Sequence, residues 1–206
     1  MLNFNKLYSD EYAKMDKNCP LSEYPFPNFK RDSYKSLNGI WNYKTTKNPN
    51  DFTNITDEIL VPFPIESNAS LVGKRLNKGD YIIYKTTFNL ESNFIKENTF
   101  IHFLGVDQTY HIILNGVEFD EIEPLNFPTK INVSKAIKEK NELIVVVKDT
   151  LNPIYPLGKQ SNKPKGIFYT PFSGIYYPVF IESVANNYIE NIKISTTLTS
   201  VKLFIN

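Results

Sequence analysis

The chain is poor in the residues that build redox and metal sites. Its 206 residues include one cysteine, Cys19, and two histidines, His102 and His111. A single cysteine cannot form an intramolecular disulfide, which is typical of a reducing compartment. The histidines lie on separate strand-like runs without paired cysteines or an Asp-x-His spacing, so we interpret them as packed or half-exposed sheet residues. We expect no metal and no cofactor.

The sequence also lacks a long apolar run. It contains no stretch of 18 apolar residues, as a membrane-spanning helix would require. Residues 1–16 are polar and of mixed charge, without the apolar segment of a secretory signal. These features predict a cytoplasmic protein without a membrane partner.

A charge imbalance is missing as well. The chain has 23 basic and 22 acidic side chains, giving a formal net charge of +1. Because no basic stripe stands out, we expect no nucleic-acid partner. The one dense basic cluster, Lys159, Lys163 and Lys165, lies in a proline-rich loop. The sequence has no nucleophile elbow, P-loop or Rossmann fingerprint.

What the sequence does contain is a series of short apolar runs separated by Pro, Gly and Asn. Its aromatic residues are mostly 13 Tyr and 15 Phe, which favour strands. Asn115-Gly116 between two apolar runs is a strong hairpin signal, because both central residues of a type I′ turn need positive φ. The unbroken apolar run in 141–148 predicts burial on both faces. The expected strands are 37–43, 59–61, 81–90, 99–104, 109–114, 117–119, 131–133, 141–148, 175–181, 188–194 and 200–205.

This pattern predicts an all-β sandwich or barrel, and the long excursion before the strand at 175–181 fits a jelly roll. Three prolines before residue 31 indicate an irregular arm lying on a surface. The strand pattern restarts after residue 183, and two strands alone rarely form a stable unit. We divide the chain into an N-terminal arm (1–24), a jelly-roll domain (25–184) and the start of a second, truncated β-sandwich domain (185–206).

Several segments in a fixed order then suggest a family. They include Leu37-Asn-Gly-Ile-Trp41, Val61-Pro-Phe-Pro-Ile-Glu-Ser67, His102-Phe-Leu-Gly-Val-Asp107, Ile113-Leu-Asn-Gly116, Asn141-Glu-Leu-Ile-Val-Val-Val147, Gly158-Lys-Gln160 and Gly166-Ile-Phe-Tyr-Thr-Pro-Phe-Ser-Gly-Ile175. The series resembles the N-terminal sugar-binding domain of glycoside hydrolase family 2, which contains β-galactosidases, β-glucuronidases and β-mannosidases. The resemblance covers residues 25–183, and the tail from Tyr188 resembles the first strands of an immunoglobulin-like domain.

The resemblance implies a jelly roll similar to galactose-binding domains. It also implies that both catalytic carboxylates lie on a (β/α)₈ barrel outside these residues, so we expect no catalytic residue here. The expected partners are a carbohydrate with a terminal β-linked sugar and the chain's own barrel, and a further candidate partner is a second copy in a homo-oligomer. One departure is that Phe168 or Tyr169 stands where β-galactosidases carry an acidic sugar-site residue.

The best candidate site in the sequence is the loop at 150–174. Sugars are bound by aromatic faces together with planar polar groups, because a pyranose presents apolar C–H faces and hydroxyl edges. The candidate substrate-binding residues are Asp149, Tyr155, Lys159, Gln160, Phe168 and Tyr169. The alternative is that the loop packs against the barrel and never contacts sugar.

Other features have structural interpretations. We interpret Trp41 as a core aromatic, because it lies in a strand pattern. The acidic run Glu118, Asp120, Glu121 and Glu123 is expected to be a solvated, edge-protecting stretch. Three functions stay open: an accessory domain of a glycosidase, a stand-alone lectin-like binding module, and a purely structural or subunit-interface domain.

Overall fold

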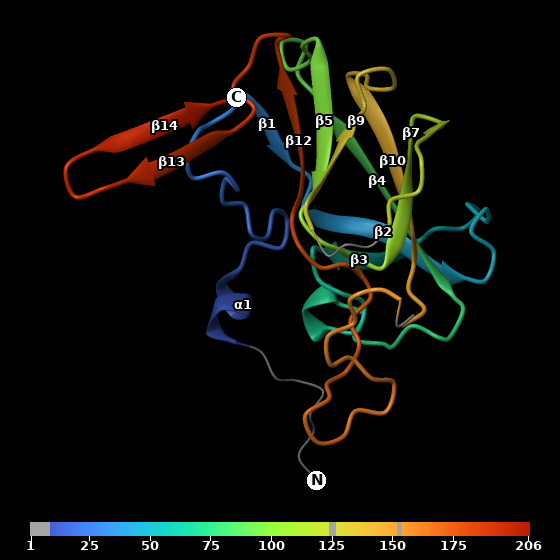
Figure 1. Cartoon of the computed structure of the whole chain (residues 1–206). Coiled ribbons are helices and arrows are strands. Elements are labelled where there is room, and N and C mark those ends of the chain that lie inside the picture. The colour runs from blue at the N-terminus through green and yellow to red at the C-terminus, as the bar shows by residue number, and fades with distance from the viewer. Residues whose placement is uncertain (1–8, 124–126, 152–153) are drawn as a thin grey trace.

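In the computed structural model, residues 9–123, 127–151 and 154–206 are described, and the body of the domain is built from two antiparallel sheets packed face to face (Figure 1). One sheet has the order β1 (Ser33–Ser36), β12 (Val179–Val184), β5 (Asn98–Phe103) and β9 (Thr129–Asn132). The other has the order β3 (Asp57–Val61), β2 (Gly39–Thr46), β4 (Tyr81–Asn89), β10 (Lys140–Lys148), β7 (Thr109–Leu114) and β8 (Val117–Glu118). This arrangement confirms the predicted all-β jelly-roll sandwich.

Smaller elements complete the fold. They are the pair β6 (Val106–Asp107) and β11 (Gly174–Ile175), the hairpin β13 (Ile192–Thr196) and β14 (Val201–Ile205), the helix α1 (Asp10–Lys14) and the 3₁₀ turn η2 (Asn68–Ser70). The first eight residues of the predicted arm, and Pro153 of the predicted loop, lie outside the described residues. No helix in the described ranges is long and apolar enough to cross a bilayer.

The core lies between the two sheets. Val145 and Val147 of β10 face Ile101 and Ile181 of the opposite sheet within one cluster of buried apolar residues. Trp41 is buried in the same cluster, and its indole N–H donates to the Leu37 carbonyl (2.8 Å). The prediction of a core aromatic at position 41 is therefore confirmed.

β10 is buried on both faces, as its unbroken apolar run predicts. Ile144 and Val146 point away from the main core and pack with Ile83 on the outer face of the six-stranded sheet. The loop after β2 covers them with Phe52 and Ile55.

The predicted hairpin turn is also confirmed. Asn115 and Gly116 have φ values of 53° and 83°, and they join β7 to β8. The acidic residues that follow the turn, from Glu118 to Glu123, are exposed. This placement agrees with a solvated run of charges.

The predicted strand at 175–181 is divided in the structure. The chain forms β11 and β12 with a break at residues 176–178, because Pro178 has no N–H to donate to a ladder. The break is a bulge, as a proline within a strand pattern suggests: residues 176–178 lie opposite Leu104 and Gly105, and the N–H groups of Tyr176 and Tyr177 both donate to the Gly105 carbonyl (3.1 and 3.3 Å). Four further elements, β1, β6, α1 and η2, were not among the predicted ones.

The N-terminal arm lies on the outer face of the four-stranded sheet. Phe26 packs edge-to-face on Phe180 of β12, with ring centroids 5.6 Å apart. Asn38 holds the arm to this sheet, since its amide donates to the Pro20 carbonyl (2.8 Å) and its side-chain oxygen accepts from the Val179 N–H (2.9 Å). The Leu-Asn-Gly segment therefore has a defined structural role.

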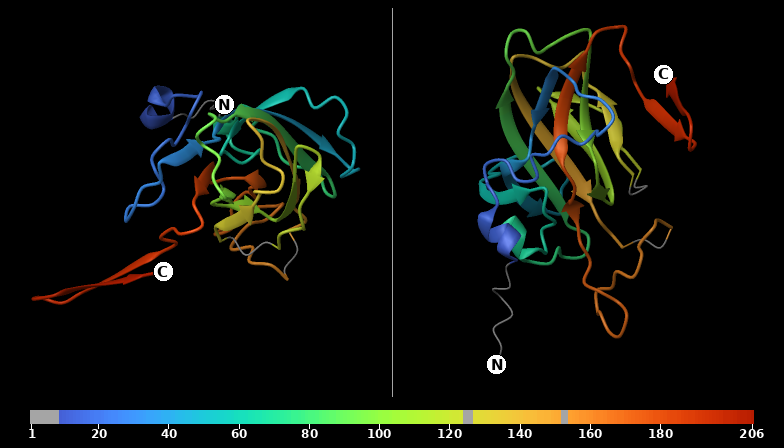
Figure 2. Two further views of the ribbon diagram at one scale, coloured as in Figure 1. Left: turned by 90° about the horizontal axis from the view of Figure 1, so that it is seen from above. Right: turned by 90° about the vertical axis from the view of Figure 1, so that its left-hand side faces the viewer.

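The hairpin β13–β14 projects away from the sandwich (Figure 2). Its apolar side chains Val201, Leu203 and Phe204 are all more than half exposed. Its base is tied to the sandwich by Arg31, whose guanidinium donates to the Ile189 carbonyl (2.6 Å). That these strands open an immunoglobulin-like domain stays a prediction, as do the proposed domain boundaries.

Candidate functional site

Three chain segments meet at one end of the sandwich. They are the loop 62–80 between β3 and β4, the strand β6 with the residue after it, and the loop 149–173 between β10 and β11 (Figure 1). The two loops are joined by Arg75, whose guanidinium donates to the Asn162 carbonyl (2.9 Å). This meeting point places carboxyl groups from all three segments in one polar cluster.

Gly174 allows the segments to approach so closely. It pairs with Asp107 in the short β11–β6 ladder and has a φ of 87°, which favours glycine. A Cβ at this position would overlap the hydroxyl of the buried Tyr84. The Ser-Gly-Ile segment is therefore fixed by packing beneath the loop.

Asp107 is the most deeply buried carboxyl of the cluster, with 1% of its surface exposed. Gln160 donates to it from its side-chain amide (2.9 Å) and accepts from the Phe172 N–H (2.9 Å). Burial raises the pKa of Asp107 to about 7, the hydrogen bond from Gln160 opposes this rise, and the neighbouring Asp149 and Glu66 add to it. Because Gln160 is a neutral amide, its hydrogen bond does not cancel the effect of burial on this carboxyl.

Ser173 links the other two carboxyl groups. Its hydroxyl lies 2.7 Å from Glu66 Oε1 and 2.8 Å from Asp149 Oδ2, and its backbone N–H donates to Glu66 Oε2 (2.8 Å). A hydroxyl has one proton to donate. The hydroxyl therefore donates to one of the two carboxyl groups at a time. Burial raises the pKa of Glu66, and the hydrogen bonds from the Ser173 hydroxyl and N–H oppose this rise.

A small polar pocket of about 110 Å³ is lined by all three members of this trio. Arg75, Asn77 and Lys78 also line it and are exposed, whereas Asp149 and Ser173 are buried and Glu66 is half-buried. The pocket thus combines buried or half-buried acceptors with exposed cationic donors. Such a set can bind hydroxyl groups through the acceptors and anionic groups through the cations.

The six residues predicted from the sequence fall into two sets. Asp149 and Gln160 are 8% exposed and belong to the buried cluster. Lys159, Phe168 and Tyr169 lie on the exposed surface of the loop, and Tyr155 is half-buried outside the pocket lining. Within the second set, Lys159 and Tyr169 are in contact, since the Tyr169 hydroxyl accepts a hydrogen bond from the Lys159 N–H (3.2 Å).

Sequence reasoning missed Asp107, Glu66 and Ser173 as members of the site. All three lie in segments on which the family resemblance depends, but no spacing rule joins them. The topology brings them together, since β6 and β11 pair across 67 positions of the chain (174 minus 107). The sequence did contain one signal for them: the segments 61–67 and 102–107 each include a carboxylate, Glu66 and Asp107.

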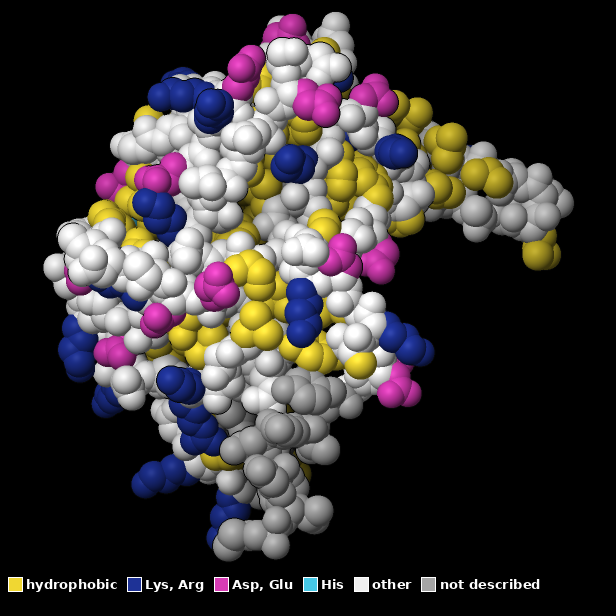
Figure 3. Space-filling model, turned by 180° about the vertical axis from the view of Figure 1, so that it is seen from behind, with side chains coloured by type: hydrophobic (Ala, Val, Ile, Leu, Met, Phe, Trp, Pro, Cys, Tyr) yellow, Lys and Arg dark blue, Asp and Glu magenta, His cyan; other side chains and the backbone are white. Residues whose placement is uncertain are grey.

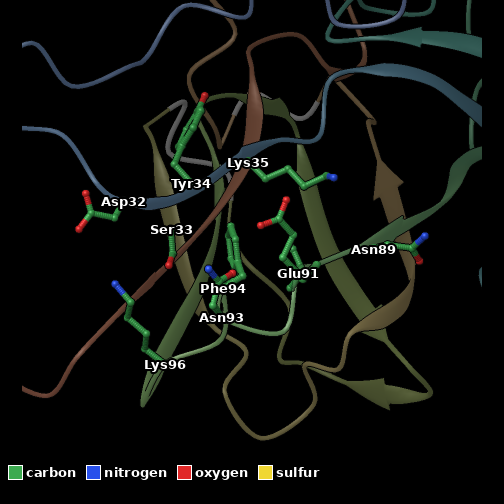
Figure 4. A pocket seen from close by; sticks show the side chains of 10 residues that line it. Asp32, Ser33, Tyr34, Lys35, Asn89, Glu91, Asn93, Phe94 and Lys96 are labelled. Atoms are coloured by element: carbon green, nitrogen blue, oxygen red, sulfur yellow. The ribbon is translucent and has the colours of Figure 1, made fainter.

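A second and larger pocket, of about 470 Å³, lies between β1 and the segment that follows β4 (Figure 4). Lys35 and Glu91 point into it from opposite sides. Its charged side chains are all exposed, and it contains none of the residues predicted for the site. We therefore place the candidate site at the loop end.

A jelly-roll sandwich with a polar cluster beneath one long loop defines the class of this domain. No family model matches the chain, and no curated protein matches it in sequence. Solved structures do match it, and those most similar to it include bacterial β-glucuronidases.

The chain is 23% identical to a β-glucuronidase of an uncultured Clostridium species, with a TM-score of 0.68 over 89% of this chain and 35% of that one. It is 20% identical to the β-D-glucuronidase of Dictyoglomus thermophilum, with a TM-score of 0.63 over 89% of this chain and 34% of that one. It is 17% identical to the Ruminococcus gnavus β-glucuronidase in complex with D-glucuronic acid, with a TM-score of 0.64 over 89% of this chain and 36% of that one. The chain spans about a third of the length of these proteins, and at these identities the likeness shows the fold.

Proposed function

We propose that this chain is a non-catalytic, sugar-binding accessory domain of a glycoside hydrolase that acts on terminal β-linked sugars, β-glucuronidase-like or β-galactosidase-like. The observation that carries the proposal is the extent of the structural match: almost all of this chain corresponds to only a third of each β-glucuronidase. The remaining two thirds of such an enzyme leave room for the (β/α)₈ barrel that the sequence resemblance implies.

In this role the loop end shapes the rim of the substrate pocket. Asp149 and Gln160 hold the loop 149–173 in place from below, while Lys159, Phe168 and Tyr169 present a cation and two aromatic faces to the substrate. The pocket above Ser173 supports this assignment, because hydroxyl-binding groups lie directly beneath the loop.

The test is hydrolysis of 4-nitrophenyl β-D-glucuronide and 4-nitrophenyl β-D-galactoside by this chain and by the full product of its gene. We expect hydrolysis by the full product and none by the 206-residue chain. In the full product, Phe168→Ala should raise KM more than it lowers kcat, because the side chain only positions substrate. Phe52→Ala, which lies on the covered outer face, serves as the control.

A gene that encodes no barrel after residue 206 would contradict the proposal. So would hydrolysis by the isolated chain.

A stand-alone lectin-like module is the second candidate. One observation favours it: Ile167, Phe168 and Tyr169 are 71%, 51% and 46% exposed and form an apolar strip on the loop. Isothermal titration of the chain with galactose, glucuronate, mannose and a β-linked disaccharide separates the candidates. Saturation by one sugar without a barrel supports the lectin, and absence of heat supports the accessory domain.

A further inference from the structure

Six cationic side chains surround the loop end of the sandwich. Every one is exposed, and within the described part of the chain none takes part in an ion pair. We call them the basic rim: Lys74, Arg75, Lys78, Lys159, Lys163 and Lys165.

The two segments that carry the rim are unbalanced in charge. Residues 62–80 and 149–175 contain six Lys or Arg and three Asp or Glu, so their net charge is 6 − 3 = +3. The whole chain has a net charge of +1, which leaves 1 − 3 = −2 for all other residues. The three acids are Glu66, Asp80 and Asp149, and none of them is exposed.

This imbalance is invisible along the sequence, because about 80 positions separate the two basic groups. The fold joins them through the hydrogen bond from Arg75 to Asn162, and Arg75, Lys78 and Asn162 line the same pocket. From behind, Lys and Arg side chains gather over the described part of the lower end (Figure 3). The rim is therefore a product of tertiary structure.

The surroundings of the rim identify the kind of anion. The exposed apolar strip of Ile167, Phe168 and Tyr169 lies on the same loop as three of the cations, and such faces pack against sugar rings. The same pocket is lined by Glu66 and Asp149, which accept hydrogen bonds from hydroxyl groups. Hydroxyl-rich and anionic groups combined on one chain are the chemistry of an acidic polysaccharide.

We propose that the basic rim binds an acidic glycan, with carboxylate or sulfate groups along the glycan chain lying on the six cations. The inference rests on the proposed function for the ligand being a glycan. It adds the substrate class. Arg75 and Lys78 line the pocket, whereas the other four cations lie outside its lining and would contact the glycan beyond its terminal sugar. Binding of this kind weakens as salt rises, because the cations are exposed to solvent.

The experiment is fluorescence anisotropy with a labelled hyaluronan hexasaccharide, which carries glucuronate carboxylates, and with labelled chitohexaose, which is neutral. We expect the chain to bind hyaluronan, to bind it less tightly as NaCl is added, and to bind chitohexaose more weakly. The combined variant Lys159→Ser, Lys163→Ser and Lys165→Ser should bind hyaluronan about tenfold more weakly, the effect of losing three exposed ion pairs.

A matched control removes three other exposed lysines. Lys135, Lys138 and Lys140 lie where β9 leads into β10, at the opposite end of the sandwich (Figure 1). Their combined replacement by Ser changes the net charge equally and should leave hyaluronan binding unchanged. Circular dichroism of both variants confirms that each has folded.

Three outcomes overturn the proposal: no hyaluronan binding, equal loss in both variants, or equally tight binding of a labelled oligothymidylate. The last outcome would make the rim a general polyanion site. These results are independent of the hydrolysis test. Failure of hydrolysis with rim-dependent hyaluronan binding rejects the enzyme assignment alone, and the reverse result rejects the rim alone.

Discussion

Two carboxyl groups of this domain are equally buried and yet differ in their chemistry. Glu182, on the outer face of β12, is 2% exposed, and Asp107, beneath the loop, is 1% exposed. Burial acts to raise both pKa values. At Glu182 this effect is outweighed by hydrogen bonds and charge from His102 and Arg31, each 2.9 Å away, so its pKa is lowered. At Asp107 the partner is neutral Gln160, and the pKa is raised.

The opposite pKa shifts suggest different roles: Glu182 has a structural role, and Asp107 is suited to a functional site. Glu182 fixes Arg31, which in turn holds Ile189 at the base of the C-terminal hairpin. The ion pairs thus join the arm, the sheet and the tail. Among the residues that the structure describes, Asp107 forms no ion pair, and its charged neighbours Glu66 and Asp149 line the small polar pocket. A carboxyl with a strongly raised pKa in such surroundings marks a candidate functional site.

The largest effect should come from Glu182→Ala. The substitution leaves Arg31 and His102 largely buried without their acid, and breaking a buried pair in this way costs about 3–5 kcal/mol of unfolding free energy. Urea denaturation at neutral pH measures it. Glu118→Ala, which removes an exposed acid beside His111, is the control and should cost less than about 0.5 kcal/mol. Equal costs would mean that the two acids have similar roles.

Asp107→Asn should raise the free energy of unfolding, whereas Glu182→Ala lowers it. A raised folded pKa means that the folded protein binds the proton more tightly than the unfolded chain. The unfolding free energy therefore falls as pH rises from the ordinary Asp value, about 4, to about 7. Asparagine is neutral throughout and still accepts from Gln160. We expect the variant to match the parent at pH 4 and to be more stable by about 2 kcal/mol at pH 8.

Glu182→Gln provides the contrast for the same pH series. Its folded pKa is lowered, so its stabilisation is present above the ordinary Glu value and is lost as pH falls through the folded pKa. The variant should therefore be less stable than the parent at pH 8, with the gap closing in acid. A destabilising effect of Asp107→Asn at pH 8 would show that the raised pKa has been misread.

The sequence predicts the sheets better than it predicts the site, for a physical reason. Strands such as 81–90 and 141–148 are encoded by local apolar patterns, and the turn at Asn115-Gly116 by the conformation of two residues. The segment 175–181 was predicted as one strand, but the structure divides it into β11 and β12 at Pro178. The two parts pair with β6 and β5, which lie far away in sequence, so the local pattern does not reveal the division.

The candidate site depends on tertiary structure more than the strands do. Asp149 and Gln160 were found because they flank or occupy a long loop, yet the structure places them in the supporting cluster. Asp107 and Glu66 were missed because β6 and β11 must pair before they meet. Of the predicted aromatic residues of the loop, Phe168 and Tyr169 are exposed, as the sugar-binding interpretation requires, and Tyr155 is half-buried. Contact with sugar stays a prediction.

A smaller effect is expected for Ser173→Ala. The backbone N–H of residue 173 still donates to Glu66, but Glu66 and Asp149 lose the hydroxyl between them. Loss of this buried hydrogen bond should cost about 1–2 kcal/mol in urea denaturation at pH 7. A cost below about 0.5 kcal/mol would show that the hydroxyl makes no net contribution to stability.

The smallest effect should come from Tyr169→Phe, at the surface of the same loop. The substitution removes only the acceptor for the Lys159 N–H, an exposed bond whose loss costs about 0.5 kcal/mol. The ring and its apolar face remain, so hyaluronan binding should hardly change. Tyr169→Ser removes both, and it should weaken hyaluronan binding while costing little stability, because 46% of the side chain is already in solvent. If both variants bind alike, the ring does not contact the glycan, and the basic rim acts through charge alone.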